Sequence, residues 1–161
     1  MAVFQSVVLP PKSVWVCWAD NSKYWKVSPM QNSRFSQKAE LLEVCWLQIQ
    51  GTFDTAILDK DTTYSLLFFF KHNDRASGLG NGAEVSLSQK DGKTICKRQV
   101  HLKPGSSDFI KQDGEEWLAI EAGTFQPTGI TPEISFNLLD CSSNWKSGLV
   151  FAGVEIRAVS T

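Results

Sequence analysis

The chain has 161 residues and a mass of 17.9 kDa, enough for one domain with a sizeable core but not for two ordinary domains. Hydrophobic residues make up 42% and charged residues 20%, a globular composition that excludes wholesale disorder. The 16 lysines and arginines nearly cancel the 17 acidic residues, so the chain lacks the net positive charge of a dedicated nucleic-acid or anionic-membrane binder. We therefore expect no nucleic-acid partner.

The amino terminus shows no targeting signal. It has no basic segment, and its apolar stretch ends at Pro10-Pro11, unlike a secretory signal peptide. The strongest apolar run, residues 66–70, has the length of a strand and falls far short of the roughly 18 residues that a membrane helix needs. We therefore expect a cytoplasmic protein without membrane insertion, folded as a single domain over residues 1–161.

Short strands with alternating polarity dominate the rest of the chain. Alternation of period two predicts strands over residues 44–50, 83–88, 116–121, 133–139 and 149–157. Residues 62–71 are apolar on both faces, which predicts a central strand that is covered on both sides. Turn sequences such as Asn81-Gly82 and Asp91-Gly92 separate the strands. This pattern predicts an all-β fold, an antiparallel sandwich or barrel.

Two segments differ from this pattern. Residues 37–44 have the only helix-forming composition, which predicts one short helix before the strand that follows. Residues 73–82 are polar and contain three glycines, so we expect them to form the loosest connection.

The segment 13–27 concentrates aromatic residues around a polar stretch. Trp18 and Trp25 flank Asp20 and Asn21, and Tyr24 precedes Trp25. A pyranose ring has an apolar C–H face that stacks on an indole, and its hydroxyl groups form hydrogen bonds with carboxylates, amides and lysines such as Lys26 in the same segment. The segment therefore indicates a sugar site, against the alternative that its tryptophans fill the core.

Two further tryptophans favour a structural role. Trp15 alternates with Val14 and Val16, which is typical of a strand that packs on the core. Trp46 shares its predicted strand face with Gln48 and Gln50, so it is either packed on a half-covered sheet or an exposed third stacking platform; we favour packing.

The sequence contains few parts for catalysis. Neither a nucleophile motif nor a metal-ligand spacing occurs around His72, His101 or the four cysteines, so we expect no enzyme, no metal and no cofactor. A carbohydrate-active enzyme remains an alternative, because a pair of carboxylates leaves no sequence signature.

The cysteines lack the spacing of a disulfide framework. Cys45 lies in an apolar strand pattern and is expected to be buried, whereas Cys17, Cys96 and Cys141 have polar or mixed neighbours. In a reducing cytosol we expect no intrachain disulfide, and exposed thiols link chains only after oxidation.

Five longer motifs follow one another along the chain. They are W-A-D-N-x-x-Y-W-K at 18–26, E-V-C-W-L-Q-I-Q-G at 43–51, T-Y-S-L-L-F-F-F-K at 63–71, E-E-W-L-A-I-E-A-G-T-F at 115–125 and N-W-K-S-G-L-V-F-A-G-V-E-I-R at 144–157. Together they resemble the plant phloem protein 2 family, and the chain is most similar to the small lectins of cucurbit phloem.

The resemblance implies a jelly-roll-like antiparallel β-sandwich, a homodimer, and binding of N-acetylglucosamine oligomers, such as chitin fragments and N-glycan cores. It assigns the sugar site to Trp18 and Trp25 with Asp20, Asn21 and Tyr24 between them. It adds Trp145 and Lys146 from the carboxy-terminal signature of the family as candidate sugar-binding residues, which either line the site or pack the sandwich.

The resemblance also implies a location in the sap of phloem sieve tubes. There, Cys17, Cys96 or Cys141 would form intermolecular disulfides with other phloem proteins after wounding. The alternative function is therefore a structural phloem protein that polymerises through disulfides, with sugar binding secondary.

Overall fold

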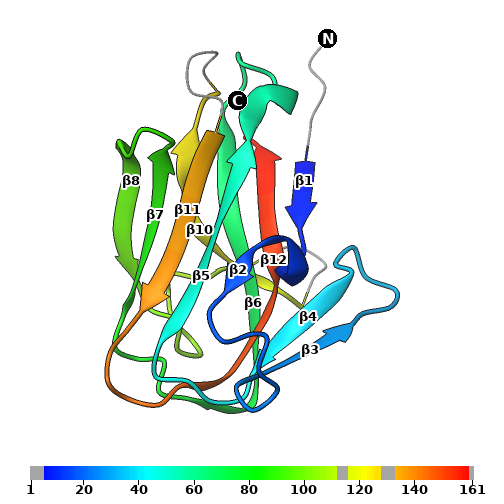
Figure 1. The fold of residues 1–161 in the computed structure, drawn as a ribbon, viewed down its shortest axis with the longest axis vertical. Coiled ribbons are helices and arrows are strands. Elements are labelled where there is room, and N and C mark those ends of the chain that lie inside the picture. Colours follow the sequence, from blue (N-terminus) through cyan, green and yellow to red (C-terminus); the bar gives the residue numbers. More distant parts are fainter. Residues whose placement is uncertain (1–5, 112–115, 128–132, 160–161) are drawn as a thin grey trace.

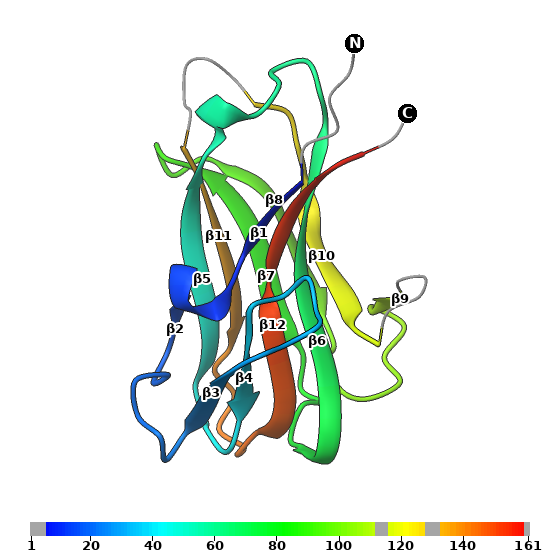
Figure 2. The same cartoon turned by 90° about the vertical axis from the view of Figure 1, so that its right-hand side faces the viewer.

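The computed structural model describes residues 6–111, 116–127 and 133–159, and within them the chain forms two antiparallel sheets packed face to face (Figures 1 and 2). The larger sheet has the order β3 (Trp25–Pro29), β4 (Gln37–Leu41), β12 (Ser147–Ala158), β6 (Tyr64–Ser77), β10 (Leu118–Phe125) and β9 (Ile110–Lys111), and β1 (Ser6–Leu9) also pairs with β12. The smaller sheet has the order β2 (Trp15–Val16), β5 (Leu47–Asp54), β11 (Glu133–Asp140), β7 (Ala83–Gln89) and β8 (Thr94–Val100).

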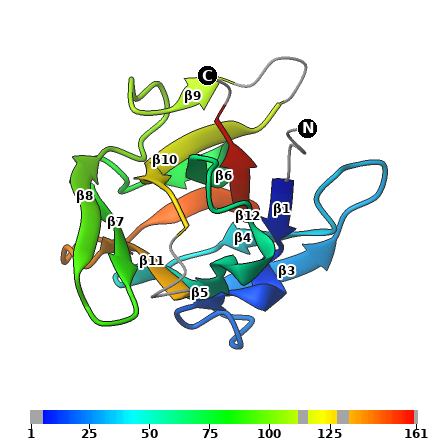
Figure 3. The same ribbon diagram turned by 90° about the horizontal axis from the view of Figure 1, so that it is seen from above.

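The predicted antiparallel β-sandwich is confirmed. Helical structure in the described residues is limited to two single 3₁₀ turns, η1 (Pro11–Ser13) and η2 (Thr55–Ile57). None of these helical turns is long and apolar enough to cross a membrane. Seen along the strands in Figure 3, the two sheets form two layers, and β1 begins and β12 ends at the same end of the sandwich.

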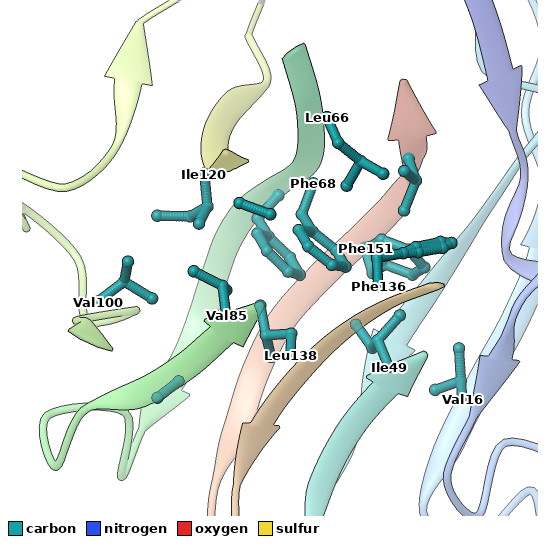
Figure 4. Close-up of a cluster of buried hydrophobic side chains, with 14 of the residues drawn as sticks. Val16, Ile49, Leu66, Phe68, Val85, Val100, Ile120, Phe136, Leu138 and Phe151 are labelled. Atoms are coloured by element: carbon teal, nitrogen blue, oxygen red, sulfur yellow. The ribbon is translucent and has the colours of Figure 1, made fainter. Parts of the chain in front are cut away.

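Strand β6 is the centre of the molecule and is covered on both faces, as the sequence predicted. Leu66, Phe68 and Phe70 point between the sheets, where Phe68 meets Phe136 of β11 with ring centroids 5.9 Å apart (Figure 4). On the opposite face Phe69 packs against Phe35, at 5.2 Å between centroids, in a second apolar cluster that includes Trp117. Burial of every residue from 64 to 70 anchors this half of the strand firmly in the core.

Two predictions about the connections are wrong. Residues 37–41 form strand β4, because Ala39 and Leu41 are buried at alternate positions and β4 pairs with β3 on one side and β12 on the other. Strand β6 continues to Ser77, so the turn of the predicted 73–82 loop is confined to 78–82. In both places, pairing with neighbouring strands overrides local composition.

Trp25 occupies a buried position, which contradicts its predicted role as a sugar-stacking platform. It begins β3 and its side chain is 1% exposed, within the core between the sheets. Its indole Nε1 donates a hydrogen bond of 3.0 Å to the carbonyl oxygen of Cys17, which fixes the start of the connection from β2 to β3. Trp25 therefore anchors the β2–β3 connection to the core.

Glu155 of β12 joins three segments on the outer face of the larger sheet. Its carboxylate accepts a hydrogen bond from the Ser6 hydroxyl of β1 and forms ion pairs with Arg157 and, at 3.3 Å, with Arg34. Burial raises the pKa of this carboxyl group, but the hydrogen bonds from Ser6 and Arg157 and the charges of Arg157 and Arg34 together outweigh burial, so the pKa lies below its ordinary value.

We predict that Trp25→Ala lowers the free energy of unfolding by about 4 kcal/mol, because it removes a fully buried indole and leaves a cavity. Urea unfolding measures the effect. The matched control is Trp145→Ala, which truncates a 60% exposed tryptophan and should change stability by less than about 1 kcal/mol. Equal losses in the two variants would contradict the burial of Trp25.

We predict that Glu155→Gln destabilises the protein by about 2 kcal/mol at neutral pH but has little effect in acid. The lowered pKa means that the ionised carboxylate stabilises the fold fully above the unfolded-state pKa of about 4.3, and that this contribution is lost as the pH falls through the folded-state pKa. Urea unfolding over a pH series tests this, with the exposed Glu43→Gln as control. A destabilisation that does not shrink in acid would contradict it.

Candidate functional site

Three tryptophans and a tyrosine surround a cavity at the end of the sandwich that lies opposite the start of β1 and the end of β12 (lower end of Figure 1). The cavity has a volume of about 200 Å³ and is lined by Trp18, Tyr24, Val44, Cys45, Trp46 and Trp145. The exposed fractions of the three indoles are 53%, 46% and 60% in chain order. We call this site the aromatic cavity. Apolar surface gathered in this way and left in contact with water is typical of a binding site.

The connection from β2 to β3 presents Trp18 through an unusual backbone conformation. Trp18 has φ +68°, in the left-handed region that residues other than glycine and asparagine rarely adopt. The chain then turns on Asn21, whose main-chain carbonyl accepts hydrogen bonds from the amides of Tyr24 and Trp25. The turn brings the ring of Tyr24 edge-on to that of Trp18, with centroids 5.6 Å apart. Strain of this kind persists where the surrounding structure holds it, and it is common at functional sites.

A buried lysine joins the two segments that carry Trp46 and Trp145. The side chain of Lys146 is 0% exposed, and its ammonium donates to the carbonyl oxygens of Cys45, Ser142 and Asn144 at 2.5, 2.9 and 3.0 Å. These three acceptors match its three N–H donors, and the carboxylate of Asp140 lies 3.7 Å away. Lys146 thus positions the aromatic cavity but does not line it, which corrects its prediction as a sugar contact.

The turn after β6 closes against the same region. The side-chain amide of Asn144 donates to the carbonyl oxygen of Gly78 at 2.6 Å and accepts from Asn81 at 2.6 Å. Gly78 has φ +75°, and a Cβ there would lie 1.9 Å from the carbonyl oxygen of Trp145. Only glycine permits this approach, so the turn after β6 and the connection from β4 to β5 both fix the segment that presents Trp145.

The structure brings together some of the predicted sugar-binding residues and separates others. Trp18, Tyr24 and Trp145 meet at the aromatic cavity. Asp20 lines a neighbouring cavity of about 400 Å³, which it shares with Trp18 and Trp15. Asn21 is exposed and uses its side-chain oxygen to accept from the Lys23 amide at 2.9 Å, and Lys26 lies exposed on β3. Trp25 and Lys146 are buried, so neither is available to a ligand.

Trp46 lines the site, although its sequence pattern favoured packing. It is 46% exposed, and its indole Nε1 donates to the side-chain oxygen of Gln48 at 2.9 Å. The sequence signal for this exposure was that Trp46 shares its predicted strand face with the polar Gln48 and Gln50. The core assignment of Trp15 is also wrong: Trp15 is 49% exposed on the outer face of the smaller sheet, whereas the adjacent Val16 points into the core.

The four cysteines are free thiols. Cys141 is exposed, Cys17 and Cys96 are half-buried, and Cys45, which was expected in the core, is half-buried and lines the aromatic cavity. Burial and then the charge of Asp20 raise the pKa of the Cys17 thiol, while a hydrogen bond with Trp18 lowers it by less. In the part of the chain that the structure describes, no group of three metal-ligating side chains occurs.

Curated relatives are F-box and phloem protein 2-like proteins of Arabidopsis thaliana. One F-box protein is 34% identical over 163 residues, which cover 94% of this chain and 51% of the relative, and F-box protein PP2-B10 is 32% identical over 94% of this chain and 59% of its own length. Phloem protein 2-like A1 is 29% identical, with 91% and 58% covered. The chain thus spans about half to three-fifths of the length of these relatives.

A solved structure of an α-L-arabinofuranosidase matches all of this chain and 23% of its own, with 12% identity and a TM-score of 0.49, which bears on neither function nor ligand. The sequence model of the phloem protein 2 family, by contrast, matches residues 5–158, nearly the whole chain. The chain belongs to the phloem protein 2 family.

Proposed function

We propose that this chain is a lectin that binds oligosaccharides of N-acetylglucosamine in the aromatic cavity and catalyses no reaction on them. The observation that carries the proposal is the gathering of three half-exposed indoles around one small apolar cavity. Membership of the phloem protein 2 family supports it, because the resemblance first seen in the sequence is to lectins of this family.

The chemistry of the cavity suits an acetylated amino sugar. The indole faces of Trp18, Trp46 and Trp145 provide stacking surfaces for the C–H faces of pyranose rings. Val44 and Cys45 add apolar wall that suits the methyl of an acetamido group, which a plain hexose lacks. The platform is therefore Trp18 with Trp46 and Trp145, in place of the predicted pair of Trp18 and Trp25.

The backbone around the cavity keeps the three indoles exposed and apart from one another. Each lies on a different connection, and main-chain hydrogen bonds between Val44 and Lys146, at 2.8 and 3.0 Å, join the last two connections. A rigid, preformed site loses little conformational entropy when a sugar binds. The homodimer, the cytoplasmic location and the intermolecular disulfides remain predictions.

We predict that Trp145→Ala weakens binding of chitotriose by at least about 30-fold, or about 2 kcal/mol, because it removes one of the three stacking surfaces of the site. Isothermal titration calorimetry measures the affinity, and urea unfolding checks the fold. Trp15→Ala is the matched control: it truncates a similarly exposed indole outside the aromatic cavity and should leave chitotriose binding unchanged. Unchanged affinity in folded Trp145→Ala protein would refute the proposed site.

We predict that Lys146→Met lowers stability by about 3 kcal/mol and also weakens chitotriose binding, since it leaves three carbonyl oxygens and the buried Asp140 without their cation. Lys26→Met, at an exposed position, should change neither quantity. Calorimetry on the folded fraction separates positioning from stability. If the folded variant kept full affinity, Lys146 would be a structural residue only.

A further inference from the structure

The outer face of the smaller sheet contains a groove that is separate from the aromatic cavity. It has a volume of about 410 Å³ and lies across β5, β11 and β7, on the face turned towards the viewer in Figure 1. Its outward side chains include Trp15, Gln50, Thr52, Ser86, Ser135 and Asn137. We call it the sheet groove. It shares no lining residue with the aromatic cavity.

Strand register explains why the face is hollow. Asn137 of β11 is paired with Gln50 of β5 on one side and with Ser86 of β7 on the other, and Gln50 is paired with Trp15. Directly paired residues of antiparallel strands project to the same face. The short serine and asparagine side chains over the central strands therefore form a low floor, and the large half-exposed indole of Trp15 rises at its edge.

The lining of the sheet groove combines polar side chains with Val14, Trp15 and Phe136, and it carries no charge. Among the described residues that line it, every outward polar group is a hydroxyl or an amide, although a water-exposed sheet face accommodates charged side chains at little cost. The ion pair between Glu84 and Lys97 lies beside the groove, towards the edge strand β8. Such a surface favours a neutral ligand with many hydroxyl groups over an anion or a basic peptide.

Hydrogen bonds on the floor hold its amides in position. Gln48 donates through Nε2 to the side-chain oxygens of Asn137, at 3.0 Å, and Gln50, at 3.3 Å, and it accepts from the Trp46 indole. Both acceptor amides keep their NH₂ groups, which have no partner within the described part of the chain. Two amides held by Gln48 thus lie on the outer face of the sheet beside the exposed indole of Trp15, which is the combination that fixes a sugar ring.

We propose that the sheet groove is a second carbohydrate-binding surface, which takes an extended, neutral glycan chain without N-acetyl groups and acts independently of the aromatic cavity. The ligand class follows from the lining: hydroxyl and amide groups suit a polyhydroxylated chain, and Trp15 supplies a single stacking wall where the aromatic cavity gathers three indoles. Trp15 is paired with Gln50, which lies four residues beyond Trp46, or about 13 Å along the strand, so the two sites do not share a stacking residue.

The test uses cellohexaose as the probe of the sheet groove and chitotriose as the probe of the aromatic cavity. Two-dimensional NMR of the labelled protein maps the binding of each. We expect cellohexaose to shift the backbone amides of β5, β7 and β11, and to bind with the same affinity when chitotriose is present at saturation.

Variants then separate the two sites. Trp15→Ala removes the wall and Ser135→Arg fills the floor with a long charged side chain; both should weaken cellohexaose binding at least about tenfold and leave chitotriose binding intact. Trp145→Ala should have the reverse effect. Thr124→Arg, which places the same side chain at an exposed position on the other sheet, is the matched control and should change neither.

Several results would overturn the proposal: no binding of cellohexaose up to its solubility limit, competition between the two sugars, or amide shifts confined to the 17–24 and 141–146 connections. Concentration-dependent self-association that shifts the same β5, β7 and β11 amides without sugar would assign the face to a second copy of the chain instead. Loss of chitotriose binding alone would refute the proposed function and leave the sheet groove standing.

Discussion

Burial of the Lys146 ammonium imposes the arrangement of the end of the sandwich that carries the aromatic cavity. A charged group removed from water is stable in a protein only when its donors are satisfied and an opposite charge is near. Here the three acceptors are main-chain carbonyls of the segments before β5 and before β12, with Asp140 completing the charge balance. If those segments moved apart, the buried ammonium would lose its hydrogen-bond acceptors. Lys146 therefore fixes the spacing between Trp46 and Trp145.

The sandwich supplies the rigid base that this arrangement needs. Strands β6 and β12 are buried along much of their length, and the apolar clusters on both faces of β6 leave it little freedom to shift. Trp25 performs the equivalent task for the β2–β3 connection, since its buried indole holds the Cys17 carbonyl below the exposed Trp18. Buried and exposed tryptophans thus have complementary roles: one fixes the backbone on which the other is displayed.

The sandwich and its central strand were predictable because alternation of period two is a local property of the sequence. The strand at 133–139 matches β11 closely, and the doubly covered strand at 62–71 matches the buried first half of β6, although β6 continues to Ser77. The exposure of individual tryptophans was less predictable, because it depends on which sheet face the opposite layer covers. Trp46 shared a face with Gln48 and Gln50, which was a usable signal, whereas nothing local distinguishes Trp25 from Trp18. The role of Lys146 leaves no sequence pattern at all, since its partners are main-chain atoms.

The position of the strand ends has a practical consequence. Strand β1 begins, and β12 ends, at one end of the sandwich, while the aromatic cavity lies at the other. The twelve residues of β12, which runs between the two ends, span about 40 Å. The described chain thus begins at Ser6 and ends at Val159 at the end of the sandwich opposite the aromatic cavity. Coupling through either end to a bead, a sensor surface or a fluorescent partner should orient the molecules uniformly, with the cavities facing the solution.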